Sequence, residues 1–224
     1  MLGAAGRTGS YRDRHHAGEV LARRVAEREL VDPVVLGLAR GGVPVAAEVA
    51  RALGAPLRVT VARKIGAPGQ PELALGAVTA HGPATWDERL LRSFHLDEAE
   101  LAAERDRERE EARSREQRFG QTSAPRLSGR DAVLVDDGLA TGATARAAVR
   151  MLREESDPRS VLLAVPVGAP DAVRALGQEA DEVLCVLQPV GFAAVGQFYG
   201  SFRATTDEEI LGILEEFAAG SGSP

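Results

Sequence analysis

The chain has 224 residues, of which 44% are hydrophobic and 27% are charged, and its formal net charge at pH 7 is -6. These values are typical of a globular protein with a sizeable core, and the acidic charge argues against nucleic acid or an anionic membrane surface as the main partner. No apolar run approaches the roughly 20 residues that span a bilayer, and the single cysteine, Cys185, excludes an intrachain disulfide. We therefore expect a cytoplasmic protein without a nucleic-acid or membrane partner.

The first part of the chain alternates between helix and strand patterns. Apolar residues at helical spacing predict a helix over 15–29 and a second helix over 43–53, which ends before Gly54. Short apolar runs predict one strand that begins at Val34 and another over 57–62. This order is the outline of a βαβ unit with parallel strands.

A Gly- and Pro-rich stretch interrupts this alternation. Residues 66–71 have the composition of an exposed loop, and the residues around 81–84 alternate weakly, as in a β-hairpin. From 97 to 118 Glu and Arg dominate, and opposite charges three and four residues apart favour a long solvent-exposed helix. A lid or a dimer arm is the alternative role for this charged helical insertion.

The rest of the chain returns to short apolar strands between helices, as in a sheet covered on both faces. The expected elements are the strands 132–135, 160–168 and 182–190 and the helices 144–155, 170–180 and 207–217. A hydrophobic section at 192–202 precedes the last helix, and 218–224 is expected to be a disordered tail. Because the sequence has no internal repeat and no evident linker, we expect one α/β domain over 1–224.

Two adjacent acids, Asp136 and Asp137, follow an apolar strand, and a short turn rich in Gly and Thr follows them. Ligands collect at the carboxyl ends of parallel strands, and this turn leads into a helix N-terminus, which offers free N–H groups to an anion. Gly142 permits close backbone approach, while Thr141 and Thr144 add hydroxyl donors for a phosphate. Carboxylates suit sugar hydroxyls or hydrated Mg²⁺ instead, so the loop predicts a phosphorylated sugar as its ligand. The alternative is that the acids and glycines only shape a turn.

The stretch VLVDDGLATGAT, residues 133–144, resembles the phosphoribosyl-pyrophosphate signature of the type I phosphoribosyltransferases. GLARGGVP, residues 37–44, resembles the pyrophosphate loop of that family, and RKIG, residues 63–66, lies where the family often has a basic residue. Lys64, the only lysine among 27 basic residues, falls in this second segment. The resemblance extends over 11–202 and includes bacterial phosphoribosyltransferases that have no assigned acceptor.

The resemblance implies a fold and a role for each matching residue. The fold would be a parallel, Rossmann-like sheet with helices on both faces, a flexible loop or hairpin, the charged inserted helix and a small hood. The expected catalytic residues are Asp136 and Asp137, which would hold the ribose hydroxyls and, indirectly, Mg²⁺, and Arg40 and Lys64, which would grip pyrophosphate. The expected substrate-binding residues are Ala39, Gly41, Gly42, Arg63, Gly138, Leu139, Ala140, Thr141, Gly142, Ala143 and Thr144, the last four around the 5-phosphate. A cis peptide is expected at Ala39–Arg40.

The implied activity is the magnesium-dependent transfer of phosphoribose from phosphoribosyl pyrophosphate to a nitrogenous or hydroxyl acceptor, with release of pyrophosphate. Catalysis would be mostly electrostatic, residues 66–71 would form a lid, and we expect a homodimer. A regulator that binds the sugar phosphate without turnover and a generic nucleotide-binding domain are the alternatives.

The acceptor stays open in the sequence. Ala140 stands where the hypoxanthine-guanine branch of the family has an acid. Glu72 could contact the acceptor or be a solvated loop residue, and Phe198 and Tyr199 could stack on it or belong to the core. Cys185 is expected in the core.

Overall fold

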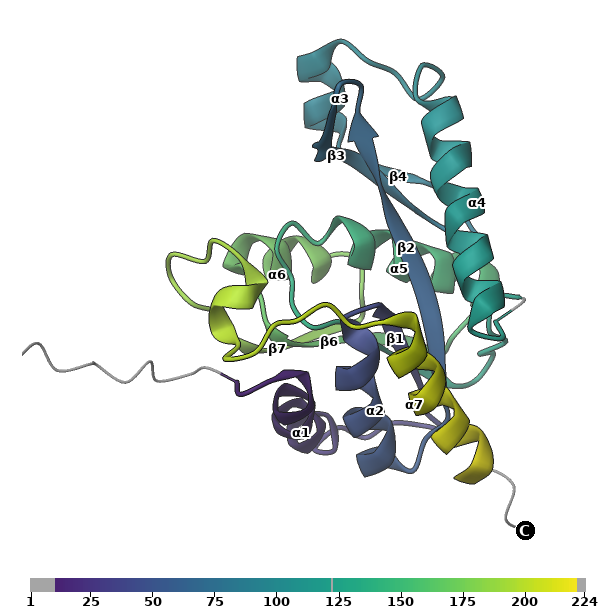
Figure 1. Cartoon of the computed structure of the whole chain (residues 1–224), viewed down its shortest axis with the longest axis vertical. Helices are drawn as coiled ribbons and strands as arrows, with labels where there is room; N and C mark the ends of the chain where they lie inside the picture. The colour runs from purple at the N-terminus through teal and green to yellow at the C-terminus, as the bar shows by residue number, and fades with distance from the viewer. Residues whose placement is uncertain (1–10, 122, 221–224) are drawn as a thin grey trace, which may run out of the picture.

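The structure is a computed structural model that describes residues 11–121 and 123–220, and over these residues seven strands form one sheet in the order β4-β3-β2-β1-β5-β6-β7 (Figure 1). The strands are β1 (Val34–Ala39), β2 (Leu57–Ala67), β3 (Gln70–Thr79), β4 (Thr85–Trp86), β5 (Asp131–Val135), β6 (Ser160–Val167) and β7 (Glu182–Leu187). The adjacent strands β2, β1, β5, β6 and β7 pair in parallel, whereas β3 pairs antiparallel with both β2 and β4. The predicted α/β fold with a parallel sheet is confirmed.

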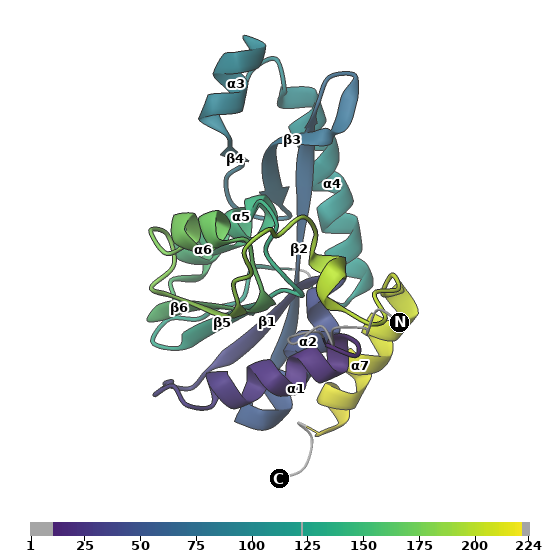
Figure 2. The same cartoon turned by 90° about the vertical axis from the view of Figure 1, so that its left-hand side faces the viewer.

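Helices cover both faces of the parallel part of the sheet (Figures 1 and 2). The helical segments are α1 (Arg14–Val25), α2 (Gly42–Leu53), α3 (Glu88–Phe94), α4 (Ala102–Arg118), α5 (Ala143–Met151) with a π-helical continuation (Leu152–Ser156), α6 (Pro170–Leu176), a 3₁₀ turn (Val195–Phe198) and α7 (Asp207–Gly220). The helices α5 and α6 lie on one face, and α1, α2 and α7 lie on the other. None of these helices is long and apolar enough to cross a membrane.

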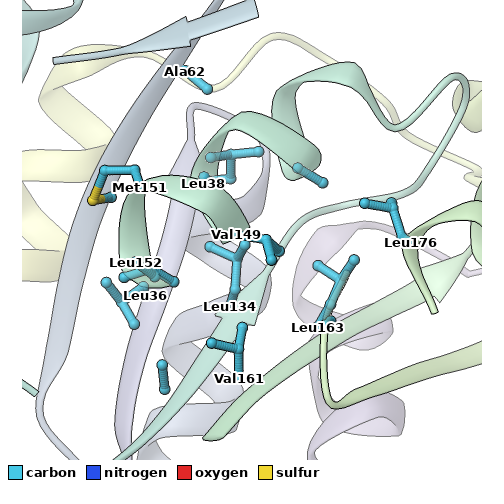
Figure 3. Close-up of a cluster of buried hydrophobic side chains, with 14 of the residues drawn as sticks. Leu36, Leu38, Ala62, Leu134, Val149, Met151, Leu152, Val161, Leu163 and Leu176 are labelled. Atoms are coloured by element: carbon cyan, nitrogen blue, oxygen red, sulfur yellow. The ribbon is translucent and has the colours of Figure 1, made fainter. Parts of the chain in front are cut away.

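The alternation of side chains along each strand produces two separate cores. Leu134 of β5 and Leu163 of β6 pack with Val149 of α5 on one face of the sheet, as Figure 3 shows. Their neighbours Val133 and Leu162 point to the opposite face and pack with α1 and α2. Because both faces are covered, every residue of β5 is buried, which explains the apolar run 132–135.

The segment around 66–71 differs from its prediction. Instead of an exposed loop, β2 and β3 continue as an antiparallel ribbon whose tip is the two-residue turn Pro68–Gly69, with Gly69 at φ 73°. Glycine adopts this positive φ without strain, so two residues suffice to reverse the chain. The predicted hairpin around 81–84 is confirmed, since β3 and β4 pair on either side of it.

The charged segment 97–118 also differs from its prediction. The helix begins at Ala102, and α4 lies along β2 with one face buried rather than exposed to solvent (Figure 1). Two glutamates of that face have partners: Oε1 of Glu116 accepts the N–H of Val61 at 2.9 Å, and Oε2 of Glu108 accepts Nε of Arg63 at 2.7 Å. Each of these hydrogen bonds reduces the cost of burying the carboxyl group.

Two smaller differences concern helix limits. The helix α3 was not predicted, although Asp87 caps it by accepting the N–H groups of Arg89 and Leu90. The expected disordered tail is wrong for 218–220, which are helical in α7, and 221–224 lie outside the described residues.

Candidate functional site

The two loops singled out in the sequence meet at the carboxyl edge of the sheet. They follow β1 and β5, which are neighbours in parallel register with Gly37 opposite Val135. Their contact depends on glycine: a Cβ at Gly42 would lie 2.5 Å from the carbonyl oxygen of Val135, and a Cβ at Gly41 would overlap Oδ2 of Asp137. The peptide bond Ala39–Arg40 is cis, as expected. The acid pair and residues 39–42, which we call the pyrophosphate-type loop, therefore form one continuous surface.

Hydrogen bonds fix both acids. Oδ1 of Asp136 accepts the backbone N–H of Asp137 at 2.8 Å. Oδ2 of Asp137 accepts the Nε–H of Arg14, from the start of α1, at 2.8 Å, and Nη2 of the same guanidinium forms an ion pair with this oxygen at 2.7 Å. The hydroxyl of Tyr199 donates to the backbone carbonyl of Asp137 at 2.6 Å. The pair is thus held in place before any ligand arrives.

The surroundings disfavour negative charge on both carboxyl groups of this pair. Burial, and secondly the charge of Asp137, raises the pKa of Asp136 well above its usual range. Burial also raises the pKa of Asp137, and the guanidinium of Arg14 works in the opposite direction. Hydroxyl donors or a cation would stabilise the ionised form of both carboxyls, so the geometry suits a diol or a metal bound through other oxygens.

The turn after the acids, residues 138–144, has the features of a phosphate-binding turn, and we call it the phosphate-type turn. Gly142 has φ 75° and caps α5, and a Cβ there would lie 2.8 Å from Cδ1 of Leu176, so glycine is required twice over. The first N–H groups of α5 have no acceptors within the helix, which makes them donors for an anion. Leu139 is anchored from behind, since its N–H donates to Val167 and its carbonyl accepts from Ala169. Ala140 and Thr141, which lie between Leu139 and Gly142, are exposed.

The basic candidates lie around this turn in different ways. Lys64 lines a cavity of about 190 Å³ together with Thr141 and Ala143, so it borders the phosphate-type turn. The neighbouring Arg63 donates to Glu108 of α4 instead. Arg40 is exposed, with Nη1 3.7 Å from Oδ1 of Asp207 at the start of α7. Of the two alternatives in the RKIG segment, Lys64 is therefore the one that the structure brings to the turn.

Residues 188–203, which we call the hood, pack against the loop that carries the two acids. A Cβ at Gly138 would lie 2.6 Å from Cγ1 of Val195, so the hood packs directly on the loop of the two acids. Phe198 stacks on Phe192 with ring centroids 5.6 Å apart, while Tyr199 is buried and bonded to the acid loop. Tyr199 thus has a structural partner, and the side chain of Glu72 lies outside the described residues.

Two further expectations concern a metal and the cysteine. No group of three or more His, Cys, Asp or Glu side chains that could hold a metal occurs among the described residues. The acid pair alone fits Mg²⁺ only with ligand oxygens or water completing its coordination. Cys185 donates to the carbonyl of Leu187 at 3.1 Å, and burial raises the pKa of its thiol to about 12, in agreement with a core position.

One residue of the site was missed in the sequence. Arg14 lies outside all three motifs, and its partner Asp137 is 123 residues away along the chain. No local pattern in the sequence distinguishes it from the neighbouring Arg12, which is exposed and lies 3.9 Å from Glu19.

Comparison with known proteins gives the family. The profile of the family described as phosphoribosyl transferase domain matches residues 13–194. A Mycobacterium tuberculosis protein (strain H37Rv), named "Putative phosphoribosyl transferase", is 46% identical over 205 residues, which are 91% of this chain and 46% of that protein. The chain thus spans about half the length of the curated relatives that it matches.

A solved structure is similar to this chain in both sequence and fold. The protein TT1426 from Thermus thermophilus is 48% identical, with a TM-score of 0.78, over 93% of this chain and 99% of that chain. The profile match includes the pyrophosphate-type loop, Lys64, the acid pair and the phosphate-type turn, which the structure gathers at one edge of the sheet. The chain belongs to the phosphoribosyl transferase domain family.

Proposed function

We propose that this protein transfers 5-phosphoribose from phosphoribosyl pyrophosphate to an acceptor and releases pyrophosphate. The observation that carries the proposal is the packing of Gly41 against Asp137, because it joins the pyrophosphate-type loop to the acid pair and its phosphate-type turn. One ligand with a 5-phosphate, a diol and a pyrophosphate would use all three parts at once.

In this proposal each part of the site has one task. Asp136 and Asp137 accept the two ribose hydroxyls, and the turn 141–144 donates N–H and hydroxyl groups to the 5-phosphate. Residues 39–42 bind the pyrophosphate, and Arg40 and Lys64 supply positive charge to it. A ligand held at both ends presents its anomeric carbon in a fixed orientation, which lowers the entropic cost of reaction.

The reaction would be accelerated mainly by electrostatics. When the bond from C1 to the pyrophosphate oxygen breaks, its electrons leave with pyrophosphate, and positive charge develops on the sugar. Arg40 and Lys64 stabilise the departing anion. The acid pair lies beside the ribose, on which the positive charge develops. Mg²⁺, held by Asp136 and Asp137 through ribose hydroxyls or water, would supply further neutralising charge. The tip Pro68–Gly69 of the ribbon is the candidate lid.

The proposal extends to the setting of the protein. We infer a cytoplasmic homodimer that uses Mg²⁺ and one small-molecule acceptor, a nitrogenous base or a hydroxyl compound, and no nucleic acid. Light scattering of the purified chain would test the dimer.

The decisive test is the double variant Asp136→Asn/Asp137→Asn with Asp171→Asn as control. The control removes a carboxylate whose side chain is 91% exposed and pairs with Arg174 of the same helix. Calorimetry with phosphoribosyl pyrophosphate and Mg²⁺ should detect binding to the wild type and the control and none to the double variant. Unchanged affinity in the double variant would overturn the assignment of the site.

Turnover is measured separately from binding. The wild type is incubated with phosphoribosyl pyrophosphate, Mg²⁺ and a panel of nucleobases and small metabolites, and pyrophosphate release is followed. Release that depends on one acceptor supports the transferase. Tight binding without release by any acceptor would favour the regulator, and preference for ATP or NAD would favour the generic nucleotide-binding domain.

A further inference from the structure

The guanidinium of Arg14 connects two parts of the molecule outside its own helix, the loop of the two acids and the hood. Its Nε donates to Oδ2 of Asp137, its Nη2 forms an ion pair with the same oxygen, and its Nη1 donates to the backbone carbonyl of Arg203 at 2.6 Å. Its Cζ lies 4.0 Å from the centroid of the Phe202 ring, within the range of a cation–π contact. The side chain is only 11% exposed. These contacts leave the guanidinium one orientation.

The segments that hold Arg14 are themselves tied together. The N–H of Tyr11 donates to the carbonyl of Phe198, and the carbonyl of Tyr11 accepts the N–H of Gly200, both at 2.7 Å. The carbonyl of Arg12 accepts the N–H of Ser201 at 2.8 Å. The start of the described chain and the hood therefore form one unit.

That unit holds Asp137 at two points. Arg14 holds the carboxylate, and the hydroxyl of Tyr199 holds the backbone carbonyl of the same residue. The hydrogen bond from Nε and the ion pair with Nη2 both involve Oδ2, the oxygen that lies against Gly41, rather than Oδ1. A carboxylate with one oxygen fixed in this way cannot rotate freely, so the direction of Oδ1 is set.

We propose that Arg14 is a positioning residue of the site: it holds Oδ2 of Asp137 so that the carboxylate meets a ribose hydroxyl in one fixed orientation. This inference rests on the proposed function, since it assumes that Asp137 binds the diol. Arg14 acts through Asp137, and it couples the hood to the ribose end of the ligand.

The test uses sugars that differ by one hydroxyl. Ribose 5-phosphate, 2-deoxyribose 5-phosphate and 3-deoxyribose 5-phosphate are titrated into the wild type and into Arg14→Gln, Arg14→Lys and Arg12→Gln. The last variant is the matched control, because the side chain of Arg12 is 75% exposed and only 3.9 Å from Glu19. The three sugars separate the hold on the diol from the hold on the phosphate.

The expected result is a selective loss. The wild type prefers ribose 5-phosphate over the deoxy sugar that lacks the hydroxyl bound by Asp137 by about tenfold or more, as for a hydrogen bond to a charged group. In Arg14→Gln this preference falls to about twofold or less, while the affinity for that deoxy sugar is unchanged. Arg14→Lys keeps part of the preference, since it keeps the charge but not the planar fork, and Arg12→Gln keeps all of it.

Three outcomes would count against these ideas, and they are distinguishable. If Arg14→Gln keeps the full preference, or loses affinity equally for all three sugars, Arg14 is not a positioning residue. If circular dichroism shows that Arg14→Gln does not fold, Arg14→Lys decides, and a full preference there overturns the inference. If the wild type binds none of the sugars and no phosphoribosyl pyrophosphate, the proposed function itself fails.

Discussion

The backbone of Gly41 lies against Oδ2 of Asp137, so closely that a methyl group on Gly41 would overlap this oxygen and lie 3.1 Å from Nε of Arg14. The φ of Gly41 is -64°, so alanine suits the backbone, and only the contact forbids it. We expect Gly41→Ala to displace the Asp137 carboxylate and to lower kcat/KM for phosphoribosyl pyrophosphate by about 100-fold, the usual effect of a misplacement near 1 Å.

The control for this prediction is Gly212→Ala in α7. Nothing lies within 4 Å of a Cβ at Gly212, which is exposed. Because alanine favours helix more than glycine does, we expect the control to keep wild-type activity and to gain about 0.5–1 kcal/mol of stability. Equal activity of both alanine variants would contradict the prediction.

Asp136→Asn is expected to stabilise the protein while it abolishes productive binding. Burial and the charge of Asp137 raise the pKa of Asp136 in the folded state well above its ordinary value. A raised carboxyl pKa contributes stability below the unfolded pKa, and this contribution is lost as the pH rises through the folded pKa. The variant should therefore melt at a higher temperature than the wild type near neutral pH, and the difference should shrink toward about pH 4. A gain that does not depend on pH would argue against this origin.

Glu116→Gln tests a second buried carboxyl at the junction of α4 and β2. Burial raises the pKa of Glu116 from 4.5 to about 7, although the N–H of Val61 and the charge of Arg58 oppose this shift. Ionised Glu116 thus destabilises the fold above about pH 7, and its stabilising contribution is complete only below 4.5.

Glutamine can still accept the N–H of Val61 but carries no charge. We expect Glu116→Gln to exceed the wild type in free energy of unfolding by about 2–3 kcal/mol at about pH 8 and to equal it near pH 4, in urea titrations at both values. Glu111→Gln, which removes an exposed partner of Arg115, should change stability little at either pH. A larger gain at low pH would refute the prediction.

Lys64 offers a test by chemical labelling. It is the only lysine in the chain, so acetylation of lysine reports on one side chain. Because Lys64 is exposed and borders the phosphate-type turn, we expect phosphoribosyl pyrophosphate with Mg²⁺ to slow its acetylation, measured by mass spectrometry of a tryptic peptide. Lys64→Arg provides the blank, and an unchanged rate at saturating ligand would place Lys64 outside the site.

Much of the fold and part of the site were predictable because their signals are local. Strands β1, β5 and β6 each contain a continuous apolar run, and the acids, Gly142 and the threonines occur within the single stretch 136–144. The α5 N-terminus and its glycine follow from conformational rules that depend on neighbours in the sequence. The structure places these residues beside the pyrophosphate-type loop because their strands are adjacent in the sheet.

The remaining features depend on contacts between distant segments. The hydrogen bond from Arg14 to Asp137 joins helix α1 to the loop after β5, and no sequence pattern near either residue predicts it. The buried face of α4 contains Glu108 and Glu116, which resemble exposed charges until their partners on β2 are known. The ribbon tip at Pro68–Gly69 was predicted as a longer loop, because glycine and proline mark a turn without giving its length.

The strand β2 changes its partner along its length. It pairs with β1 as far as Val61 and with β3 from Ala62 onward, and Glu116 binds the backbone of Val61 at this change of partner. Beyond Val61, β3 and the helices α4 and α5 hold the outer half of β2, which carries Lys64, in place of the parallel neighbour β1. The lysine and the two carboxylates are therefore supported by different parts of one sheet, and the lysine's distance from the acids depends on how the antiparallel ribbon packs on these two helices.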